Sequence, residues 1–143
     1  MDQQIDLHIH TKASDGTARP AEAVVLAKEL GLAAIAITDH DTAAGVPEAV
    51  AAGKTLGVEV IPGVEFSADY KGERAHILGL FIDPASASLQ QAMAWAEGER
   101  SARNERMIAA MAQDGMDISL EALRKAYPNA VLGRPHMAEH LVK

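Results

Sequence analysis

Short apolar segments alternate with helical segments along the first half of the chain, and this order leaves few folds open. In chain order, strand-length and helical segments fall at residues 5–9, 21–30, 33–38, 46–56 and 59–61. Gly31 and Gly57 follow the two helical segments at the position where helices often end. Apolar strands that alternate with helices, without a clean polar face, are typical of a parallel sheet buried on both faces. We therefore expect an α/β fold.

The second half of the chain follows a different pattern. Residues 74–82 form one more apolar segment of strand length, and the spacing after residue 84 is helical. Helices are expected at residues 88–113 and 119–126, and a last one is expected to begin near residue 133. The sequence therefore predicts two parts, an α/β part over residues 1–84 and a helical part over residues 85–143.

The composition narrows the classes of function. Of 143 residues, 48% are hydrophobic and 23% are charged, as in a soluble globular protein of one domain. No apolar run is long enough to span a membrane, so we expect no membrane partner and a cytoplasmic location. Cysteine is absent, which excludes disulfides, thiolate zinc sites and a cysteine nucleophile. The net charge of -7 disfavours a protein that coats duplex nucleic acid, although divalent cations in a cleft would still attract phosphate.

The first strand carries two histidines on one face. His8 and His10 are two residues apart, so their side chains point the same way, and Asp15 follows in a Ser-Asp-Gly turn. Two imidazoles and a nearby carboxylate are typical ligands of a divalent metal ion. The alternative interpretation is an edge strand with two solvated histidines.

Further imidazole and carboxylate groups follow at or near the ends of the next strands. These groups are His40, Glu65 and His76. The carboxyl ends of parallel strands meet at one edge of a sheet, so all six side chains are expected to lie together. Such nitrogen and oxygen donors suit manganese, zinc or iron, and Glu65 can bridge two ions in the arrangement used for displacement at phosphorus.

Each group also has a structural interpretation. His76 lies between apolar neighbours and can be a core histidine, and Glu65 can be a surface residue. We expect Asp39 and Asp41 to shape the loop around His40, with Asp39 a neighbour of a histidine ligand. These alternatives stay open on the residues alone, but they must explain all six positions at once.

Four groups of residues, taken in order, resemble the first three motifs of the PHP (polymerase and histidinol phosphatase) family. They are His8-Ile9-His10, Ser14-Asp15-Gly16, Thr38-Asp39-His40, and Gly63-Val64-Glu65 followed by His76. The whole chain is similar to the bacterial branch that contains nucleoside 3′,5′-bisphosphate phosphatases and 5′–3′ exoribonucleases. In that branch a helical insert follows the third motif, and residues 88–143 fit this insert.

The resemblance implies the first half of a distorted (β/α)7 barrel with a helical insertion and a centre of two to three divalent ions. Manganese is the expected metal, with iron or zinc as alternatives. The implied metal ligands are His8, His10, Asp15, His40, Glu65 and His76. Phosphates held away from the metals would contact the insert, with Arg100, Arg103, Asn104, Arg134 and His136 as candidates. The alternative for these residues is a solvated, salt-bridged helix face, because glutamates lie nearby.

The remaining ligands of the family would lie beyond residue 143. A complete barrel needs ~250 residues. We therefore expect this chain to be a fragment of a longer protein, the alternative being completion by a partner chain. About four strands cannot close a barrel, and pairing through an exposed sheet edge is possible.

The expected function is that of a metal-dependent phosphoesterase. The complete protein would hydrolyse phosphomonoesters of small nucleotides, such as 3′,5′-bisphosphonucleosides, or of RNA ends through a metal-bound hydroxide. Its partner would be a small phosphorylated nucleotide or a short RNA end. Alternatives are a histidinol phosphatase, a polymerase-associated exonuclease, or a metal-binding fragment without turnover.

Overall fold

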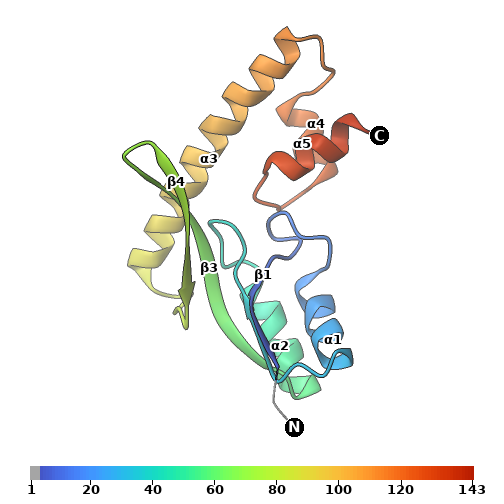
Figure 1. Cartoon of the computed structure of the whole chain (residues 1–143), viewed down its shortest axis with the longest axis vertical. Coiled ribbons are helices and arrows are strands. Elements are labelled where there is room, and N and C mark those ends of the chain that lie inside the picture. The colour runs from blue at the N-terminus through green and yellow to red at the C-terminus, as the bar shows by residue number, and fades with distance from the viewer. Residues whose placement is uncertain (1–3) are drawn as a thin grey trace.

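The computed structural model describes residues 4–143 (Figure 1). In chain order the elements are β1 (Ile5–Ile9), α1 (Pro20–Glu29), β2 (Ala34–Ile37), α2 (Val46–Leu56), β3 (Glu59–Tyr70), β4 (Glu73–Leu80), α3 (Ala87–Gln113), α4 (Leu120–Ala126) and α5 (Arg134–Leu141). The expected order of strands and helices is confirmed. Both early helices have a proline in the first turn, where its missing N–H costs nothing, and a glycine with positive φ directly after the helix or one residue later.

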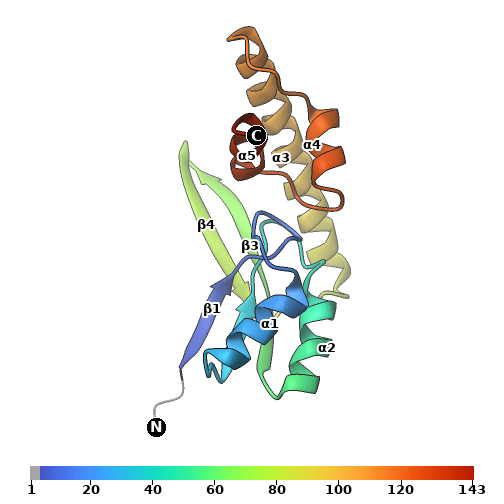
Figure 2. The ribbon, with the colours of Figure 1, turned by 90° about the vertical axis from the view of Figure 1, so that its right-hand side faces the viewer.

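The four strands form one curled sheet in the order β1-β2-β3-β4. β1, β2 and β3 are parallel, with Ala34 of β2 paired to Ile5 on one side and Glu59 on the other. β3 and β4 are antiparallel and form a long hairpin that projects from the rest of the sheet (Figure 2). The result is a mixed α/β half-barrel of four strands.

The main core lies between the parallel strands and the first two helices. β2 is buried on both faces, and its residues alternate between two apolar clusters. Ile35 and Ile37 pack against residues of α1 and α2, including Val24 and Val46. Ala34 and Ala36 point to the opposite face, where a smaller cluster forms around Ile61. The period of two explains both clusters, because successive side chains of a strand leave opposite faces.

Two expectations about the sheet are wrong. The third strand does not end at residue 61, because the chain stays extended to Tyr70 and pairs with β4. Burial on both faces holds for β2 but fails at the two edges: β4 is exposed over its first six residues, and β1 is largely exposed. A strand with only one neighbour and no covering helix keeps one side in solvent.

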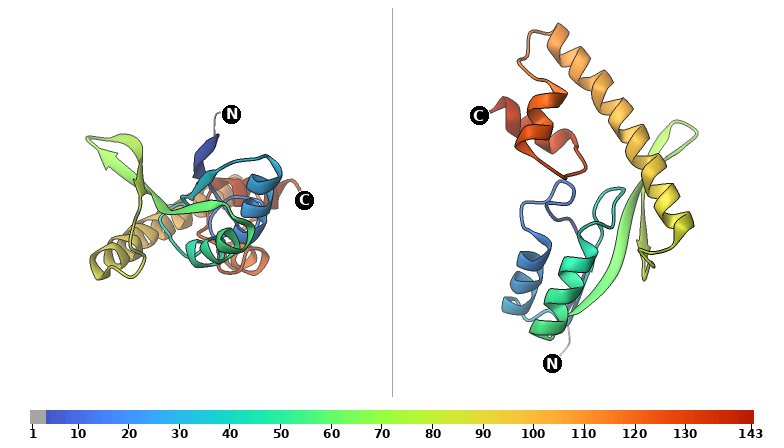
Figure 3. Two further views of the ribbon diagram at one scale, coloured as in Figure 1. Left: turned by 90° about the horizontal axis from the view of Figure 1, so that it is seen from below. Right: turned by 180° about the vertical axis from the view of Figure 1, so that it is seen from behind.

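The last three helices pack around a second apolar cluster. α3 runs past the hairpin and beyond the sheet, and α4 and α5 fold back against it (Figure 3). This cluster contains Ile108 of α3, Leu123 of α4 and Met137 of α5. Ser119 is the N-cap of α4, as expected, since its hydroxyl accepts a hydrogen bond from the Ala122 N–H. None of the helices in residues 4–143 combines the length and apolar character required to cross a membrane.

Candidate metal centre

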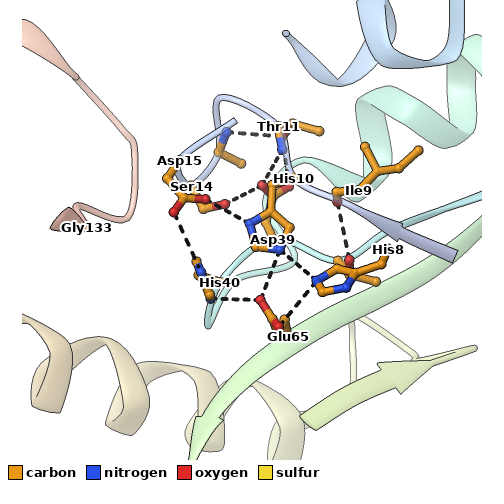
Figure 4. Close-up of polar contacts among 12 residues, drawn as sticks. His8, Ile9, His10, Thr11, Ser14, Asp15, Asp39, His40, Glu65 and Gly133 are labelled. Atoms are coloured by element: carbon orange, nitrogen blue, oxygen red, sulfur yellow. Dashed lines mark hydrogen bonds and ion pairs between the residues drawn. The ribbon is translucent and has the colours of Figure 1, made fainter. Parts of the chain in front are cut away.

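The carboxylate of Glu65 lies beside the imidazoles of His8, His10 and His40 (Figure 4). The residue is 4% exposed. Oε1 lies 3.3 Å from His8 Nε2 and 3.4 Å from His76 Nδ1. Oε2 lies 3.0 Å from His10 Nε2 and 3.1 Å from His40 Nδ1. Each carboxylate oxygen therefore faces two imidazoles, which is the disposition of a carboxylate that can bridge two ions.

The strands explain why these side chains meet. β1, β2 and β3 are parallel, so the chain leaves them at one rim, and an isolated parallel bridge joins His40 to Glu65 beyond the end of β2. His76 of β4 is paired with Ser67 of β3, which lies on the same strand face as Glu65. The hairpin therefore adds His76 to the rim from the antiparallel side.

Asp15 completes the cluster through its contacts with two histidines. Its Oδ1 lies 2.8 Å from His10 Nδ1, and its Oδ2 lies 3.7 Å from His40 Nε2. The structure thus brings all six predicted ligands together in three overlapping sets: His8 with His10 and Glu65, His10 with Asp15 and His40, and His40 with Glu65 and His76. Within each set, one donor atom from every residue lies within 4.8 Å of the others.

A buried carboxylate holds the loop that carries Asp15. Asp39 is fully buried and accepts hydrogen bonds from the Thr11 N–H at 2.7 Å, the Thr11 hydroxyl at 2.8 Å and the Ser14 hydroxyl at 2.6 Å. The loop-shaping role expected for Asp39 is thus visible in its contacts, which are with the loop itself and not with a histidine ring. Residues 11 to 14 are fixed by a side chain from the neighbouring strand end.

The contacts of the cluster shift three pKa values. A hydrogen bond to Asp15 raises the pKa of His10, and the same bond lowers the pKa of Asp15 to about 2. Burial lowers the pKa of His40, and the positive charge of Arg100 lowers it further. Among the histidines of the cluster, His40 is thus held toward its neutral form, in which one ring nitrogen has a free lone pair.

These residues fit divalent metal ions. His40 Nδ1 is buried without a hydrogen bond of suitable geometry, although a carboxylate oxygen lies close by. A neutral imidazole nitrogen and a carboxylate oxygen repel each other unless a proton or a cation lies between them. Imidazole and carboxylate donors together suit first-row transition ions such as manganese, iron or zinc. The donor set and the unpaired nitrogen fit a metal centre.

A cavity of about 680 Å³ opens beside the cluster. Asp15, His40 and His76 line one side of it, and the β3–β4 hairpin, α3 and the start of α5 form its other walls. Five arginines also line it: Arg74 of β4, Arg100, Arg103 and Arg106 of α3, and Arg134 of α5. Asp69 and Glu99 line it as well, so the cluster faces a cavity with an excess of basic side chains in a chain whose net charge is -7.

The five predicted substrate residues lie in different surroundings. Arg103 and Arg134 line the cavity. Arg100 also reaches it, but its guanidinium binds Asp41. Asn104 is buried and donates to the Leu132 carbonyl, and His136 is buried and accepts a hydrogen bond from the Gly133 N–H.

Two cavity arginines were not among the sequence-predicted residues. Arg74 is two residues before His76 on β4, so the period of a strand places both side chains on one face. Arg106 is three residues after Arg103 on α3, and the period of a helix places them as neighbours. Both periods are present in the sequence and could have identified these residues.

Comparison with known proteins decides the family. The model of the family described as "PHP domain" matches residues 6–143. The chain belongs to the PHP domain family. The resemblance seen in its motifs is confirmed, and the four-stranded curled sheet is the corresponding part of a metal-dependent phosphoesterase fold.

Similar proteins match this chain along nearly its whole length. A 5′–3′ exoribonuclease of Haemophilus influenzae is 34% identical over 143 residues, which is 100% of this chain and 52% of that protein. A 3′,5′-nucleoside bisphosphate phosphatase of Chromobacterium violaceum is 35% identical over 139 residues, 96% of this chain and 49% of that protein. The crystal structure of a candidate metal-dependent phosphoesterase from Bifidobacterium adolescentis superposes with a TM-score of 0.90 at 34% identity, covering 98% of this chain and 50% of that one. The chain thus spans about half the length of these relatives.

Proposed function

We propose that this PHP domain carries the metal site of a phosphoesterase that hydrolyses phosphomonoesters of small nucleotides, nucleoside 3′,5′-bisphosphates above all, or of RNA ends. One observation carries the proposal: the cluster of six metal-donor side chains borders a cavity, which Asp15, His40 and His76 line together with five arginines. The metal-donor side chains alone would indicate only metal binding, and the arginines alone would indicate only anion binding. Together they suit a substrate with one phosphate at the metals and a second negative group beside it.

We assign the metal ligands to the six clustered side chains. They are His8, His10, Asp15, His40, Glu65 and His76. Two to three ions would bind in the complete protein, with manganese expected and iron or zinc as alternatives. Bound ions would lower the pKa of a bound water molecule and would neutralise negative charge on the phosphate that is hydrolysed. In the chain, Asp15 would orient His10, and Glu65 would keep four imidazoles directed at one space.

We assign the second anionic group of the substrate to the unpaired cavity arginines. Within residues 4–143, no carboxylate lies within ion-pair distance of Arg74, Arg103, Arg106 or Arg134, and Arg103 Nε is buried without a hydrogen-bond partner. Burial lowers the pKa of Arg103, and repulsion by Arg100, Arg74 and Arg134 lowers it further. Burial and mutual repulsion disfavour these positive charges in the free protein. An anion that binds between the arginines would therefore be stabilised by them.

The other functions considered from the sequence receive less support. The two curated relatives described above match along nearly the whole chain, and neither is named as a histidinol phosphatase or a polymerase. Their names give a nucleoside bisphosphate and RNA as substrates, and the five arginines of the cavity suit such anionic ligands. A small phosphorylated nucleotide or a short RNA end is therefore the proposed partner.

Hydrolysis assays test this proposal. Adenosine 3′,5′-bisphosphate, histidinol phosphate and 5′-phosphorylated RNA would be supplied with manganese to this chain and to a longer chain of its relatives' length. We expect phosphate release from the bisphosphate or from RNA, at least in the longer chain, and none from histidinol phosphate. Release from histidinol phosphate alone would refute the substrate assignment. Metal binding without turnover in both chains would refute the enzymatic proposal and favour a metal-binding module.

A further inference from the structure

Asp41 joins three parts of the chain beside the cluster. It follows His40 directly, is 1% exposed and has a φ of 55°, which is uncommon for a residue other than glycine. Its N–H donates to the Glu65 carbonyl at 2.9 Å. Its Oδ1 accepts from the Ser67 N–H at 2.9 Å, and its Oδ2 accepts from Arg100 Nε at 2.7 Å. One buried residue therefore contacts β3 and α3 from the loop after β2.

Arg100 differs from the other cavity arginines. It lies on the buried stripe of α3, where residues repeat at a spacing of four: Ala96, Arg100, Asn104 and Ile108. It is 8% exposed, and its Nη2 donates to the Ser67 hydroxyl at 2.6 Å. Its charge is compensated by Asp41, whereas Arg103, on the neighbouring helix face, has no such partner within residues 4–143.

These contacts connect α3 to the hairpin. Among the hydrogen bonds within residues 4–143, those of Arg100 join α3 to β3 and to the loop after β2. Asn104, one helical turn further along, instead binds the Leu132 carbonyl of the segment before α5. Arg100 thus links the arginine-bearing helix α3 by hydrogen bonds to the hairpin, which carries Glu65 and His76, beside the apolar contact that Met93 of α3 makes with the main core.

We propose that Asp41, Ser67 and Arg100 form a specificity-determining clamp that fixes the distance between the metal cluster and the cavity arginines. Asp41 and Arg100 are positioning residues in this scheme, and the unpaired arginines contact the ligand. The inference rests on the proposed function, since a fixed distance selects ligands with two phosphates at a matching separation. A ligand with one phosphate binds at one end only and does not depend on the clamp.

The first test measures the clamp without a ligand. The chain has no cysteine, so spin labels attach only where Tyr70→Cys in the hairpin and Glu105→Cys on α3 provide thiols, and both native residues are exposed. The distance distribution between the labels is compared in four backgrounds: no further change, Asp41→Asn, Arg100→Gln, and both together. Asparagine tolerates a positive φ, so Asp41→Asn changes charge with little backbone strain.

We expect a narrow distribution without further change and a broad one in each single variant. Each single variant leaves one buried charge without its partner, and the double variant removes both charges. The double variant should therefore be narrow again. It also serves as the folded reference if a single variant unfolds. Distributions that stay narrow in folded single variants would overturn the clamp.

The second test measures ligand discrimination. Titration calorimetry with manganese present compares adenosine 3′,5′-bisphosphate with adenosine 5′-monophosphate in the same four proteins without labels. Each single variant should lose about tenfold in bisphosphate affinity and about twofold or less in monophosphate affinity. The double variant should return to within about threefold of the unsubstituted chain.

Three other results have distinct meanings. If the double variant binds as poorly as Arg100→Gln, Arg100 contacts the ligand directly and the positioning role is wrong. If Asp41→Asn gains affinity, Asp41 competes with the anion for Arg100, which also overturns the clamp. If the unsubstituted chain does not prefer the bisphosphate, the proposed substrate class fails, and the label distances alone then decide whether the clamp exists.

Discussion

His10 Nδ1 and Asp15 Oδ1 lie 2.8 Å apart across a five-residue turn that also brings Asp15 next to His40. A histidine that binds a metal ion through one ring nitrogen often donates the N–H of the other nitrogen to a carboxylate. This hydrogen bond fixes the tautomer and the orientation of the ring. In this cluster the carboxylate is itself close enough to a second imidazole to bind an ion. The pair therefore orients one ligand while supplying another.

The His10–Asp15 pair gives the metal-free protein a defined pH dependence. Asp15 has a pKa lowered to about 2, so its contribution to stability is present above its unfolded pKa of about 3.9 and is lost as pH falls toward 2. His10 has a raised pKa, so its contribution is present below about 6.5 and is lost as pH rises through the raised value. Thermal unfolding in chelator should show Asp15→Asn most destabilised between about pH 4 and 6.5. A constant difference from pH 2 to 9 would contradict the pair.

Asp39→Ala should destabilise the fold strongly. The substitution leaves two hydroxyls and one N–H near the loop without their buried acceptor. Each hydrogen bond to a charged group is worth roughly 1.5–3 kcal/mol, so the free energy of unfolding should fall by about 3–5 kcal/mol. Urea unfolding measures this change, with Asp117→Ala, at an exposed aspartate, as the control. A loss of less than about 1 kcal/mol would show that the loop holds its shape without Asp39.

Substitution of glycine by alanine should have opposite effects on stability at two positions, Gly16 and Gly98. A Cβ on Gly16 would lie 2.2 Å from the His10 carbonyl oxygen and 2.7 Å from the Thr11 nitrogen, so Gly16→Ala must displace the loop that carries Asp15. Gly98 lies within α3 with no atom within 4 Å of its added Cβ, so Gly98→Ala should stabilise the chain by about 0.5–1 kcal/mol. Thermal unfolding of both variants tests the pair, and equal effects would contradict the loop geometry.

Phosphate binding should depend on the unpaired arginines. Arg103→Gln and Arg134→Gln each remove a guanidinium that lines the cavity, and each should weaken inorganic phosphate binding by roughly tenfold at low salt. Added salt should reduce the affinity and the difference between variants. Calorimetry measures both, and Arg19→Gln is a suitable control because Arg19 pairs with Glu22 on the surface. Equal affinities in all three variants would exclude the cavity as the phosphate site.

The parallel part of the fold and the metal cluster follow from local patterns. Several features can be identified from the sequence alone: the helix ends at Gly31 and Gly57, the buried strand around Ile35, and the positions of the six donor residues. Strand ends in a parallel sheet meet at one rim by geometry alone, so polar residues at those ends are brought together whatever the details of packing. The donor residues were predictable for this reason.

The hairpin and the arginine contacts depend on long-range packing. β3 continues past Pro62 only because β4 pairs with it, and the mixed polarity of residues 62–70 gives no strong strand pattern. The sequence shows several arginines on one helix, but only packing separates Arg100, paired with a buried aspartate 59 positions earlier, from its unpaired neighbour Arg103. Such a pairing leaves no local signal.

Manganese binding tests the central claim most directly, since all else depends on the six side chains holding metal ions. Calorimetry and elemental analysis would compare the chain with Glu65→Gln and with Glu59→Gln, a control on the same strand whose native residue is exposed. We predict at least one manganese ion per chain, unchanged affinity in Glu59→Gln, and a loss of more than about tenfold in Glu65→Gln. Manganese binding that is absent, or equal in all three proteins, would contradict the metal centre.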